Sequence, residues 1–255
     1  MGHDSKIEWT NHTFNPWIGC TKVSPGCANC YAETMMDKRL RLVNWGPGRE
    51  RHRTSQTNWR EPLKWNRAGD RQRVFCASLA DWLDNEVPIE WVCDLFELVG
   101  STPNLDWLML TKRIATWRDR LELAADAGSV MAADWLAGAA PHNVWLGTSA
   151  EDQRRWDERV AHLVSLPAVV HFVSAEPLLG PIDMGSLSPS WVIVGGESGP
   201  RSRAMDPEWV RSLRDQCSTN GSAFFFKQWG GTNKRQAGRT LDGKTFDELP
   251  SLQVH

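Results

Sequence analysis

The stretch Trp107-Leu-Met-Leu-Thr-Lys-Arg113 contains the pattern that decides the fold. Four apolar residues, too few for a helix, are followed at once by polar and charged side chains. A short continuous apolar run is typical of a strand covered on both faces, as in a parallel sheet. We therefore expect residues 107–110 to form a buried strand whose carboxyl end carries Thr111, Lys112 and Arg113.

The same pattern recurs along the chain, with helical periodicity between the apolar runs. The predicted strands are Phe14–Ile18, Val74–Ala77, Trp107–Leu110, Val144–Gly147, Val169–Ser174, Trp191–Val194 and Phe224–Lys227. The predicted helices are Ala28–Leu42, Pro88–Gly100, Ala115–Ala125, Glu151–Leu166 and Pro207–Asn220. Alternating strands and helices build either a doubly wound open sheet or a barrel.

Polar residues at the ends of nearly all these strands favour the barrel. They are Cys20, Ser78 with Asp81, Lys112 with Arg113, Ser149 with Glu151, Glu176, Gly195 with Gly196 and Glu197, and Lys227 with Gln228. In a parallel barrel all carboxyl ends open on one face, where the active site is assembled. We predict a single α/β domain over residues 1–255, a full or partial (β/α) barrel of about six to seven parallel strands. Ser149 ahead of Asp152, and Asp206 ahead of Pro207, are also candidates for helix caps.

Two segments fall outside this alternation. Residues 41–73 are predicted to be a basic insertion, in which arginines are interleaved with tryptophans such as Trp59 and Trp65. Cations neutralise phosphates and flat rings stack on bases, so this composition fits a nucleic-acid or nucleotide substrate, although a solvated charged loop gives the same pattern. Residues 232–255 are predicted to be a small extension in which Asp242-Gly243 makes a hairpin turn.

The composition indicates a cytoplasmic protein. The first residues, Met1 to Glu8, are polar, and no apolar run is long enough to cross a bilayer, so we expect neither a secretory signal nor a membrane partner. A secreted chain of this size would more often distribute its cysteines for disulfides than cluster three of them in one loop. The other cysteines, Cys76, Cys93 and Cys217, are expected to be small buried residues, and most of the 15 tryptophans are expected in the core.

The clustered cysteines lie in the loop Cys20-Thr-Lys-Val-Ser-Pro-Gly-Cys27-Ala-Asn-Cys30, after the first predicted strand. Three thiolates on one short loop can hold a metal centre, and no fourth cysteine or close histidine follows them. Structural zinc sites nearly always have four protein ligands, whereas a site with three leaves a position open for a reactant. A zinc knuckle completed from far along the chain, by Cys76 or His12, is the alternative.

This cysteine triad, followed by repeated strand and helix units, resembles the radical S-adenosylmethionine superfamily. More narrowly, the chain looks like a phage-associated branch with a three-cysteine motif. The resemblance extends over residues 7–250. The phrases that carry it are FNPWIGC at 14–20, LTKR at 110–113, VWLGTS at 144–149, EPLLGP at 176–181, VIVGGESG at 192–199 and FFKQWG at 225–230.

This resemblance implies a 4Fe-4S cluster ligated by Cys20, Cys27 and Cys30, with S-adenosyl-L-methionine chelated by the fourth iron. A reductant such as flavodoxin or ferredoxin would supply the electron that cleaves the sulfonium, and the resulting 5'-deoxyadenosyl radical would abstract hydrogen from a substrate. The chain departs from the superfamily in its cysteine spacing. Six and two residues separate the cysteines instead of three and two, and Asn29 stands where an aromatic residue usually precedes the last cysteine.

The resemblance also implies which strand ends bind the cofactor. Tyr31, one position after Cys30, is a substitute for the aromatic residue that contacts adenine. Ser78 and Asp81 occupy the place of the superfamily's Gly-Gly-Glu motif, which binds the methionine amine. The other candidates are Gly195, Gly196 and Glu197 after the sixth strand, Lys112 or Arg113 for the carboxylate, Ser149 and Glu151 for the ribose or the amine, and Glu176. The alternatives are an ordinary turn at the glycines, a surface ion pair at Lys112 or Arg113 and a helix cap at Ser149.

Three function hypotheses follow from these patterns. The first is an iron-sulfur enzyme of radical S-adenosylmethionine type that modifies or repairs a nucleic-acid base or a nucleotide. The second is a zinc-stabilised nucleic-acid-binding module without catalysis. The third is a protein that keeps the cluster, does not bind the cofactor and serves as a scaffold. The sequence carries no signal for the oligomeric state.

Overall fold

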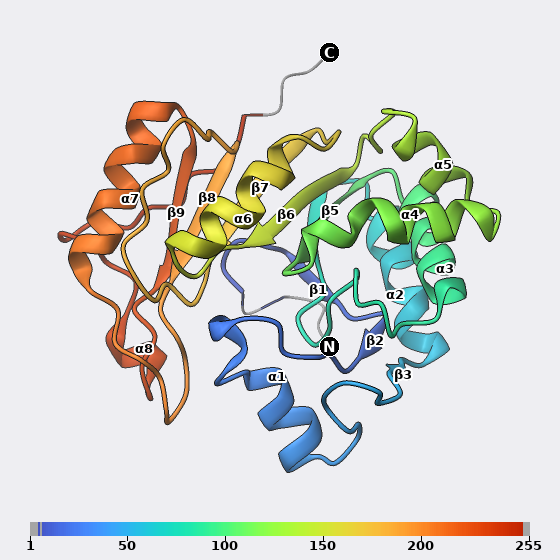
Figure 1. Cartoon of the computed structure of the whole chain (residues 1–255), viewed down its shortest axis with the longest axis horizontal. Coiled ribbons are helices and arrows are strands. Elements are labelled where there is room, and N and C mark those ends of the chain that lie inside the picture. Colours follow the sequence, from blue (N-terminus) through green and yellow to red (C-terminus); the bar gives the residue numbers. More distant parts are fainter. Residues whose placement is uncertain (1–4, 6, 252–255) are drawn as a thin grey trace. The chain divides into compact units, whose positions relative to one another are not determined.

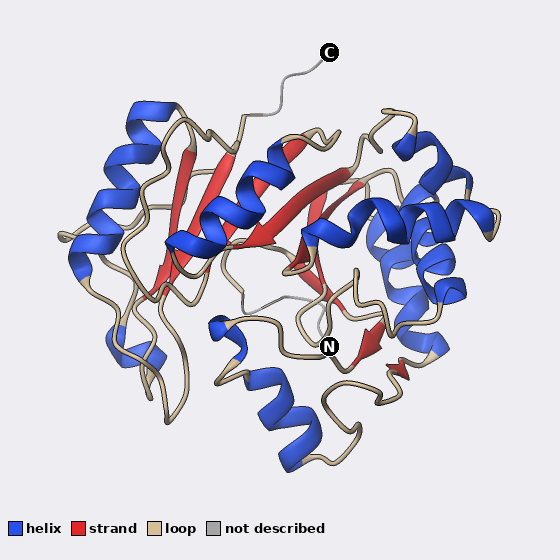
Figure 2. Ribbon diagram, in the orientation of Figure 1, coloured by secondary structure: helices blue, strands red, loops and turns tan. Residues whose placement is uncertain are grey.

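The computed structural model describes residue 5 and residues 7–251. Its main sheet has seven strands in the order β1-β4-β5-β6-β7-β8-β9 (Figures 1 and 2). These strands are β1 (His12–Phe14), β4 (Gln72–Cys76), β5 (Leu105–Thr111), β6 (Val144–Ser149), β7 (Val170–Ala175), β8 (Trp191–Gly195) and β9 (Ala223–Gln228). The pairings β1 with β4, β4 with β5, β7 with β8 and β8 with β9 are parallel. The sheet runs from β1 at one edge to β9 at the other, so the predicted α/β class is confirmed as a partial (β/α) barrel.

Helices lie between the strands and after the last of them. They are α1 (Tyr31–Glu33), α2 (Gln56–Arg67), α3 (Ile89–Gly100), α4 (Trp117–Asp126), α5 (Val130–Leu136), α6 (Gln153–Val164), α7 (Pro207–Asn220) and α8 (Lys234–Ala237). The predicted bounds of α7 are confirmed: the Asp206 carboxylate accepts from Glu208 N at 2.9 Å, and Gly221 ends the helix with φ +74°. The cap of α6 is Asp152, which accepts from a backbone amide, and not the predicted Ser149.

The chain forms two compact units. The first comprises the residues up to 23, 32–146 and 167–169, and the second comprises residues 24–31, 147–166 and those from 170 onward. Strand β6 passes from the first unit into the second. A single domain over the whole chain stays a prediction.

Tryptophans fill the core of the first unit. Trp82 and Trp135 stack with ring centroids 6.2 Å apart and 2° between their planes, and Trp117 meets Trp135 edge-on at 5.5 Å. All three side chains are almost completely buried. Large rings bury much apolar surface, so the excess of tryptophan is explained by packing, as predicted.

The first predicted strand, Phe14–Ile18, is wrong in its bounds. β1 ends at Phe14 because Pro16 lacks the amide hydrogen that a sheet ladder needs. After this break, β2 (Trp17–Ile18) pairs antiparallel with β3 (His52–Arg53) in a separate two-stranded sheet. The cysteine loop therefore follows β1 by way of the short β2.

The predicted helix over residues 28–42 is wrong in its bounds, because the chain is helical only over residues 31–39 of that range. The chain makes a 3-10 turn at Pro25–Cys27, the single turn of α1, and then a π-helix at Thr34–Arg39. Residues 26 and 29 form hydrogen bonds with side chains far along the chain. These long-range bonds hold the backbone of the cysteine loop in a non-helical path that local periodicity does not predict.

The basic insertion has regular structure of its own. It contains β3 and α2, and α2 begins after Ser55, whose hydroxyl accepts from Asn58 N at 3.3 Å. α5 was likewise not predicted from the sequence. It is a short helix that begins after a similar cap at Ser129.

The C-terminal extension contains the predicted hairpin turn. Leu241 and Lys244 exchange backbone hydrogen bonds across Asp242 and Gly243, which have φ values of +50° and +77°. Two successive positive φ values are typical of the turn that joins adjacent strands. Residues 252–255 of the predicted extension lie outside the described residues.

Candidate functional site

The three clustered cysteines form no disulfide in the described residues and are partly exposed. Cys20 belongs to the first unit, whereas Cys27 and Cys30 belong to the second. Among the residues that the structure describes, no group of three or more His, Cys, Asp or Glu side chains is arranged to hold a metal ion. The two parts of the loop have different surroundings, and each is held by a distinct set of hydrogen bonds.

Cys20 lies beside a guanidinium group. Arg113, just after β5, donates from Nη1 to Cys20 Sγ at 3.4 Å and from Nη2 to the carbonyl oxygen of Thr21 at 2.7 Å. Burial raises the pKa of the Cys20 thiol to about 12, although the charge of Arg113 opposes this shift. A positive N–H donor at this sulfur stabilises the thiolate form, which is the form that binds a metal.

Asp81 holds Arg113 in this position. Its Oδ2 accepts from Arg113 Nη1 at 3.0 Å and from the backbone N of Lys112 at 2.9 Å. Its Oδ1 accepts from Thr111 Oγ1 at 2.6 Å and from Leu83 N at 3.0 Å. Four donors therefore surround a carboxylate that is only 5% exposed. The structure brings these predicted residues together as a support for the first part of the cysteine loop.

In the second unit, Glu151 holds the loop from a position just after β6. Its Oε1 accepts from the backbone N of Gly26 at 2.9 Å, and its Oε2 accepts from Arg159 Nη1 at 3.1 Å. Arg159 also donates to the carbonyl oxygen of Ser149 at 2.8 Å. Glu151 is fully buried, and these partners compensate the loss of hydration of its charge.

Glu197 holds the same part of the loop from the segment after β8. Its Oε2 accepts from Asn29 Nδ2 at 3.0 Å and from both N and Nε of Arg203 at 2.9 Å. Arg203 also donates from Nη2 to the carbonyl oxygen of Pro25 at 3.0 Å. Burial by itself raises the pKa of the Glu197 carboxyl, but the hydrogen bonds from Arg203 and Asn29 outweigh it and lower that pKa to about 2. Glu197 is therefore an ionised anchor near Cys27.

The two glycines before Glu197 pack closely against other parts of the second unit. A Cβ at Gly196 would lie 1.9 Å from the carbonyl oxygen of Trp229. A Cβ at Gly195 would lie 3.2 Å from the carboxyl carbon of Glu176, which pairs with Lys227 Nζ at 2.6 Å. These glycines were predicted to approach a ligand, and the groups that they approach in the structure are neighbouring protein atoms.

The remaining predicted residues lie near the ends of β4 and β5 or beside the cysteines. Tyr31 is 53% exposed and follows Cys30 directly. The Ser78 hydroxyl, after β4, accepts from Asn15 Nδ2 at 3.1 Å. The side chain of Lys112, after β5, is half-buried. These residues stay candidates for cofactor contacts.

Three residues that hold the loop were not predicted, namely Asn29, Arg159 and Arg203. Arg159 had a signal in the sequence, because it lies on the same helical face as the buried Trp156 and Leu163. A charged residue on an apolar helix face needs a buried partner. Asn29 and Arg203 had no such signal, since nothing in their local sequence relates them to Glu197.

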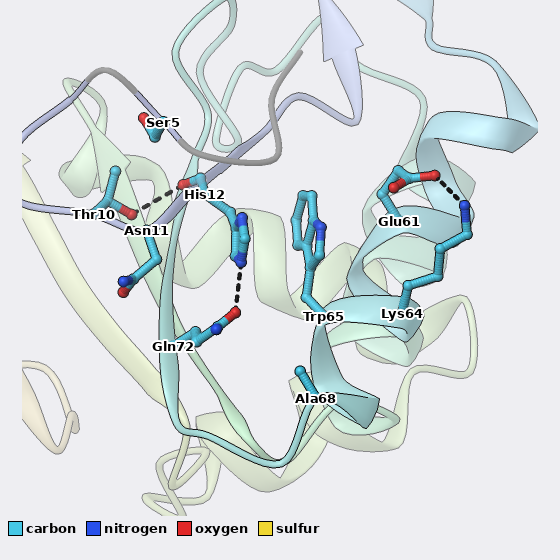
Figure 3. A pocket seen from close by; sticks show the side chains of 9 residues that line it. All are labelled: Ser5, Thr10, Asn11, His12, Glu61, Lys64, Trp65, Ala68 and Gln72. Atoms are coloured by element: carbon cyan, nitrogen blue, oxygen red, sulfur yellow. Dashed lines mark hydrogen bonds and ion pairs between the residues drawn. The ribbon is translucent and has the colours of Figure 1, made fainter.

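The alternative zinc ligands have other surroundings. Cys76 is fully buried at the end of β4, where burial raises the pKa of its thiol. The His12 ring stacks on Trp65, with centroids 4.2 Å apart, and its Nε2 lies 2.6 Å from Gln72 Oε1. His12, Trp65 and Gln72 line a cavity of about 470 Å³ at the amino ends of β1 and β4 (Figure 3). This is the end of those strands opposite to the one at which Ser78 and the cysteine loop follow.

Several cations of the basic insertion form ion pairs with acidic side chains of the first unit. Arg51 is buried and pairs with Asp84 at 2.8 Å. Arg53 pairs with Asp94 at 2.7 Å and lies 4.3 Å above the ring centroid of Trp59. Lys64 pairs with Glu61, and Arg71 pairs with Asp106. The exposed arginines of the insertion are Arg41, Arg49, Arg60, Arg67 and Arg71, of which Arg71 pairs with Asp106.

The fold and the loop together define a class of protein, a partial (β/α) barrel whose cysteine loop is held by charged side chains at the ends of its strands. The chain belongs to the family described as "Protein of unknown function (DUF5131)", whose pattern matches residues 4–250. No curated protein and no solved structure matches the chain. In the described part of the chain, no helix is both long enough and apolar enough to span a membrane.

Proposed function

We propose that this chain is an iron-sulfur enzyme of the radical S-adenosylmethionine type that acts on a nucleic acid or a nucleotide. The observation that carries the proposal is the cysteine loop. Its three cysteines lie within eleven residues and form no disulfide, and charged side chains after β5, β6 and β8 hold it. The carboxyl ends of parallel strands are where barrel enzymes assemble their active sites.

In kind and number, the donors are those of a 4Fe-4S cluster that has one iron open to a small molecule. Three cysteines supply three thiolates, the standard ligands of such clusters. Arg113 donates to Cys20 Sγ, and Ser24 Oγ lies 3.8 Å from Cys27 Sγ. Hydrogen bonds at the sulfurs offset the negative charge of the ligands and favour the reduced state of a cluster.

When bound, such a cluster would supply one-electron chemistry: an electron from a flavodoxin-type or ferredoxin-type reductant would cleave S-adenosyl-L-methionine to methionine and a 5'-deoxyadenosyl radical, which would take a hydrogen atom from the substrate. The chain's own side chains orient the loop and the cofactor. In this proposal Arg113, Glu151 and Glu197 hold the loop, and Tyr31 contacts the adenine. In the same proposal, the polar groups of the cofactor are bound by Ser78, Lys112, Ser149 and Glu176.

The proposed substrate class rests on the exposed part of the basic insertion. Arg41, Arg49, Arg60 and Arg67 supply cations for phosphate groups. Arg51 is buried in an ion pair, so we assign it to the stability of the first unit. Free thiols are expected in a reducing compartment, and we place the protein in the cytoplasm on that ground.

Anaerobic reconstitution with iron and sulfide tests the enzyme proposal. We expect about four iron and four sulfide ions per chain, and loss of both in each of Cys20→Ala, Cys27→Ala and Cys30→Ala. Reduction in the presence of S-adenosyl-L-methionine should release 5'-deoxyadenosine. Zinc without labile sulfide would instead support the zinc-stabilised binding module, and a cluster without release of 5'-deoxyadenosine would support the scaffold.

Titration of labelled DNA and RNA across salt concentrations tests the substrate class. Binding through phosphates should weaken steadily as the salt concentration rises. An absence of binding even at low salt would remove nucleic acids from the proposal.

A further inference from the structure

The segment from Gly26 to Cys30 is held at two points, each next to a cysteine. Before Cys27, the Gly26 amide donates to the Glu151 carboxylate at 2.9 Å. Before Cys30, the side chain of Asn29 donates to the Glu197 carboxylate at 3.0 Å. Because each anchor is one residue from a thiol, movement of either anchor displaces a sulfur atom.

The backbone of Glu197 is itself held by contact between two loops. Its carbonyl oxygen accepts from Gly231 N at 2.8 Å, and Gly199 N donates to Gly231 O at 3.1 Å. Gly196 and Gly230 allow this approach, since a Cβ at Gly230 would lie 2.3 Å from the Glu197 carbonyl oxygen. The segment after β9 therefore fixes the backbone of Glu197, and this determines where the carboxylate lies.

The contacts of Glu197 go beyond a structural ion pair. Arg203 donates from its backbone N, Nε and Nη2 to the carboxylate, and Nη2 also donates to the carbonyl oxygen of Pro25. A simple ion pair would not need the additional bonds to Asn29 and Pro25. Both of these residues belong to the cysteine loop. The Glu197–Arg203 pair is therefore hydrogen-bonded to this loop on both sides of Cys27.

We propose that Glu197, acting through Asn29 and Arg203, is a positioning residue that fixes the Cys27–Cys30 turn before a metal centre is bound. This rests on the proposed function, which supplies the reason for fixing the thiols. Ligands that are already in place lose less conformational freedom when the metal centre binds. Loss of the Glu197 carboxylate should loosen this turn and leave Cys20 unchanged, because Cys20 is held by Arg113 in the first unit.

Thiol alkylation of the metal-free protein tests this positioning role without a cluster. The rate of iodoacetamide labelling is measured for each cysteine by mass spectrometry in the wild type, Glu197→Ala and Glu197→Gln. In Glu197→Ala, we expect Cys27 and Cys30 to react about tenfold faster, because loss of charge-assisted hydrogen bonds raises the open population of the turn. Cys20 should react at the wild-type rate. Glu197→Gln should restore part of the protection, since its amide oxygen still accepts hydrogen bonds.

Glu158→Ala is the matched control. Glu158 is an acid on α6 that pairs with Arg154 at the surface, so its loss should change none of the labelling rates. If Glu197→Ala also exposes the buried Cys217, that variant has unfolded, and Asn29→Ala replaces it with the same selective increase expected. Wild-type rates at Cys27 and Cys30 in a folded variant would refute the positioning role. A wild-type protein that takes up no iron and sulfide would refute the proposed function without changing these labelling rates.

Discussion

Replacing Gly196 by alanine tests how closely the segment after β8 packs against the segment after β9. The added Cβ would lie 1.9 Å from the carbonyl oxygen of Trp229. Carbon and oxygen atoms in close contact stay about 3.3 Å apart, so the two backbones must separate by about 1.4 Å. A movement of this size displaces Glu197, the next residue, and with it the anchor of the cysteine loop.

The expected loss of stability follows from these contacts. Separation strains the hydrogen bonds from Gly196 N to Gln228 O at 2.9 Å and from Gly231 N to Glu197 O at 2.8 Å. Each such bond contributes about 1 kcal/mol, and an overpacked contact costs about 1–3 kcal/mol. We therefore expect Gly196→Ala to lower the free energy of unfolding by about 3 kcal/mol.

Equilibrium unfolding in urea, followed by tryptophan fluorescence, measures this loss. Gly180→Ala is the matched control, because a Cβ at Gly180 meets no atom within 4 Å. Its free energy of unfolding should stay within about 0.5 kcal/mol of the wild-type value, as for other unconstrained sites. If Gly196→Ala unfolds at the wild-type urea concentration, the close approach is absent and the reasoning about Glu197 fails with it.

Four further outcomes are expected. Arg113→Gln should lower the midpoint potential of a reconstituted cluster in a redox titration, because the positive N–H donor at Cys20 favours the reduced state. An unchanged potential would contradict this. In the folded protein the pKa of Glu197 is about 2, below its ordinary value of 4.5. The ionised carboxylate therefore stabilises the protein above pH 4.5, and this stabilisation is lost as the pH falls toward 2. The hydrogen-exchange protection factors of residues 24–31, which are corrected for the intrinsic pH dependence of exchange, should therefore fall over that range in the wild type and depend less on pH in Glu197→Gln. Cys76→Ala should keep the wild-type metal content by elemental analysis, whereas metal loss would favour the zinc alternative. Arg49→Ala should weaken nucleic-acid binding and reduce the salt slope by about 1, and an unchanged slope would exclude a phosphate contact there.

The sequence predicted the strands of the main sheet better than the connections between them. Runs such as Trp191–Val194 are apolar at every position, and such a run must be buried on both faces wherever it lies in the sheet. The first strand was misplaced because Pro16 divides one apolar run between two sheets. The helix expected over residues 28–42 begins only at Tyr31, because the cysteine loop before it is held by distant side chains, which outweigh local periodicity.

The candidate site was predictable in part. Asp81, Arg113, Glu151 and Glu197 were identified because they follow predicted strands. The structure places Arg113, Glu151 and Glu197 in contact with the cysteine loop, and Asp81 acts on that loop through Arg113. The partners through which they act were less accessible to sequence reasoning. Arg203, for example, lies in an irregular segment whose conformation no local pattern specifies.

The sequence by itself determined that this is an α/β chain with three thiols on one short loop, because burial of apolar runs and the spacing of cysteines are local properties. Only the tertiary structure decided which carboxylates hold that loop. The bonds from Gly26 to Glu151 and from Asn29 to Glu197 join residues that are 125 and 168 positions apart. Contacts at such separations depend on how the sheet brings its strand ends together, and no local preference of either residue encodes them.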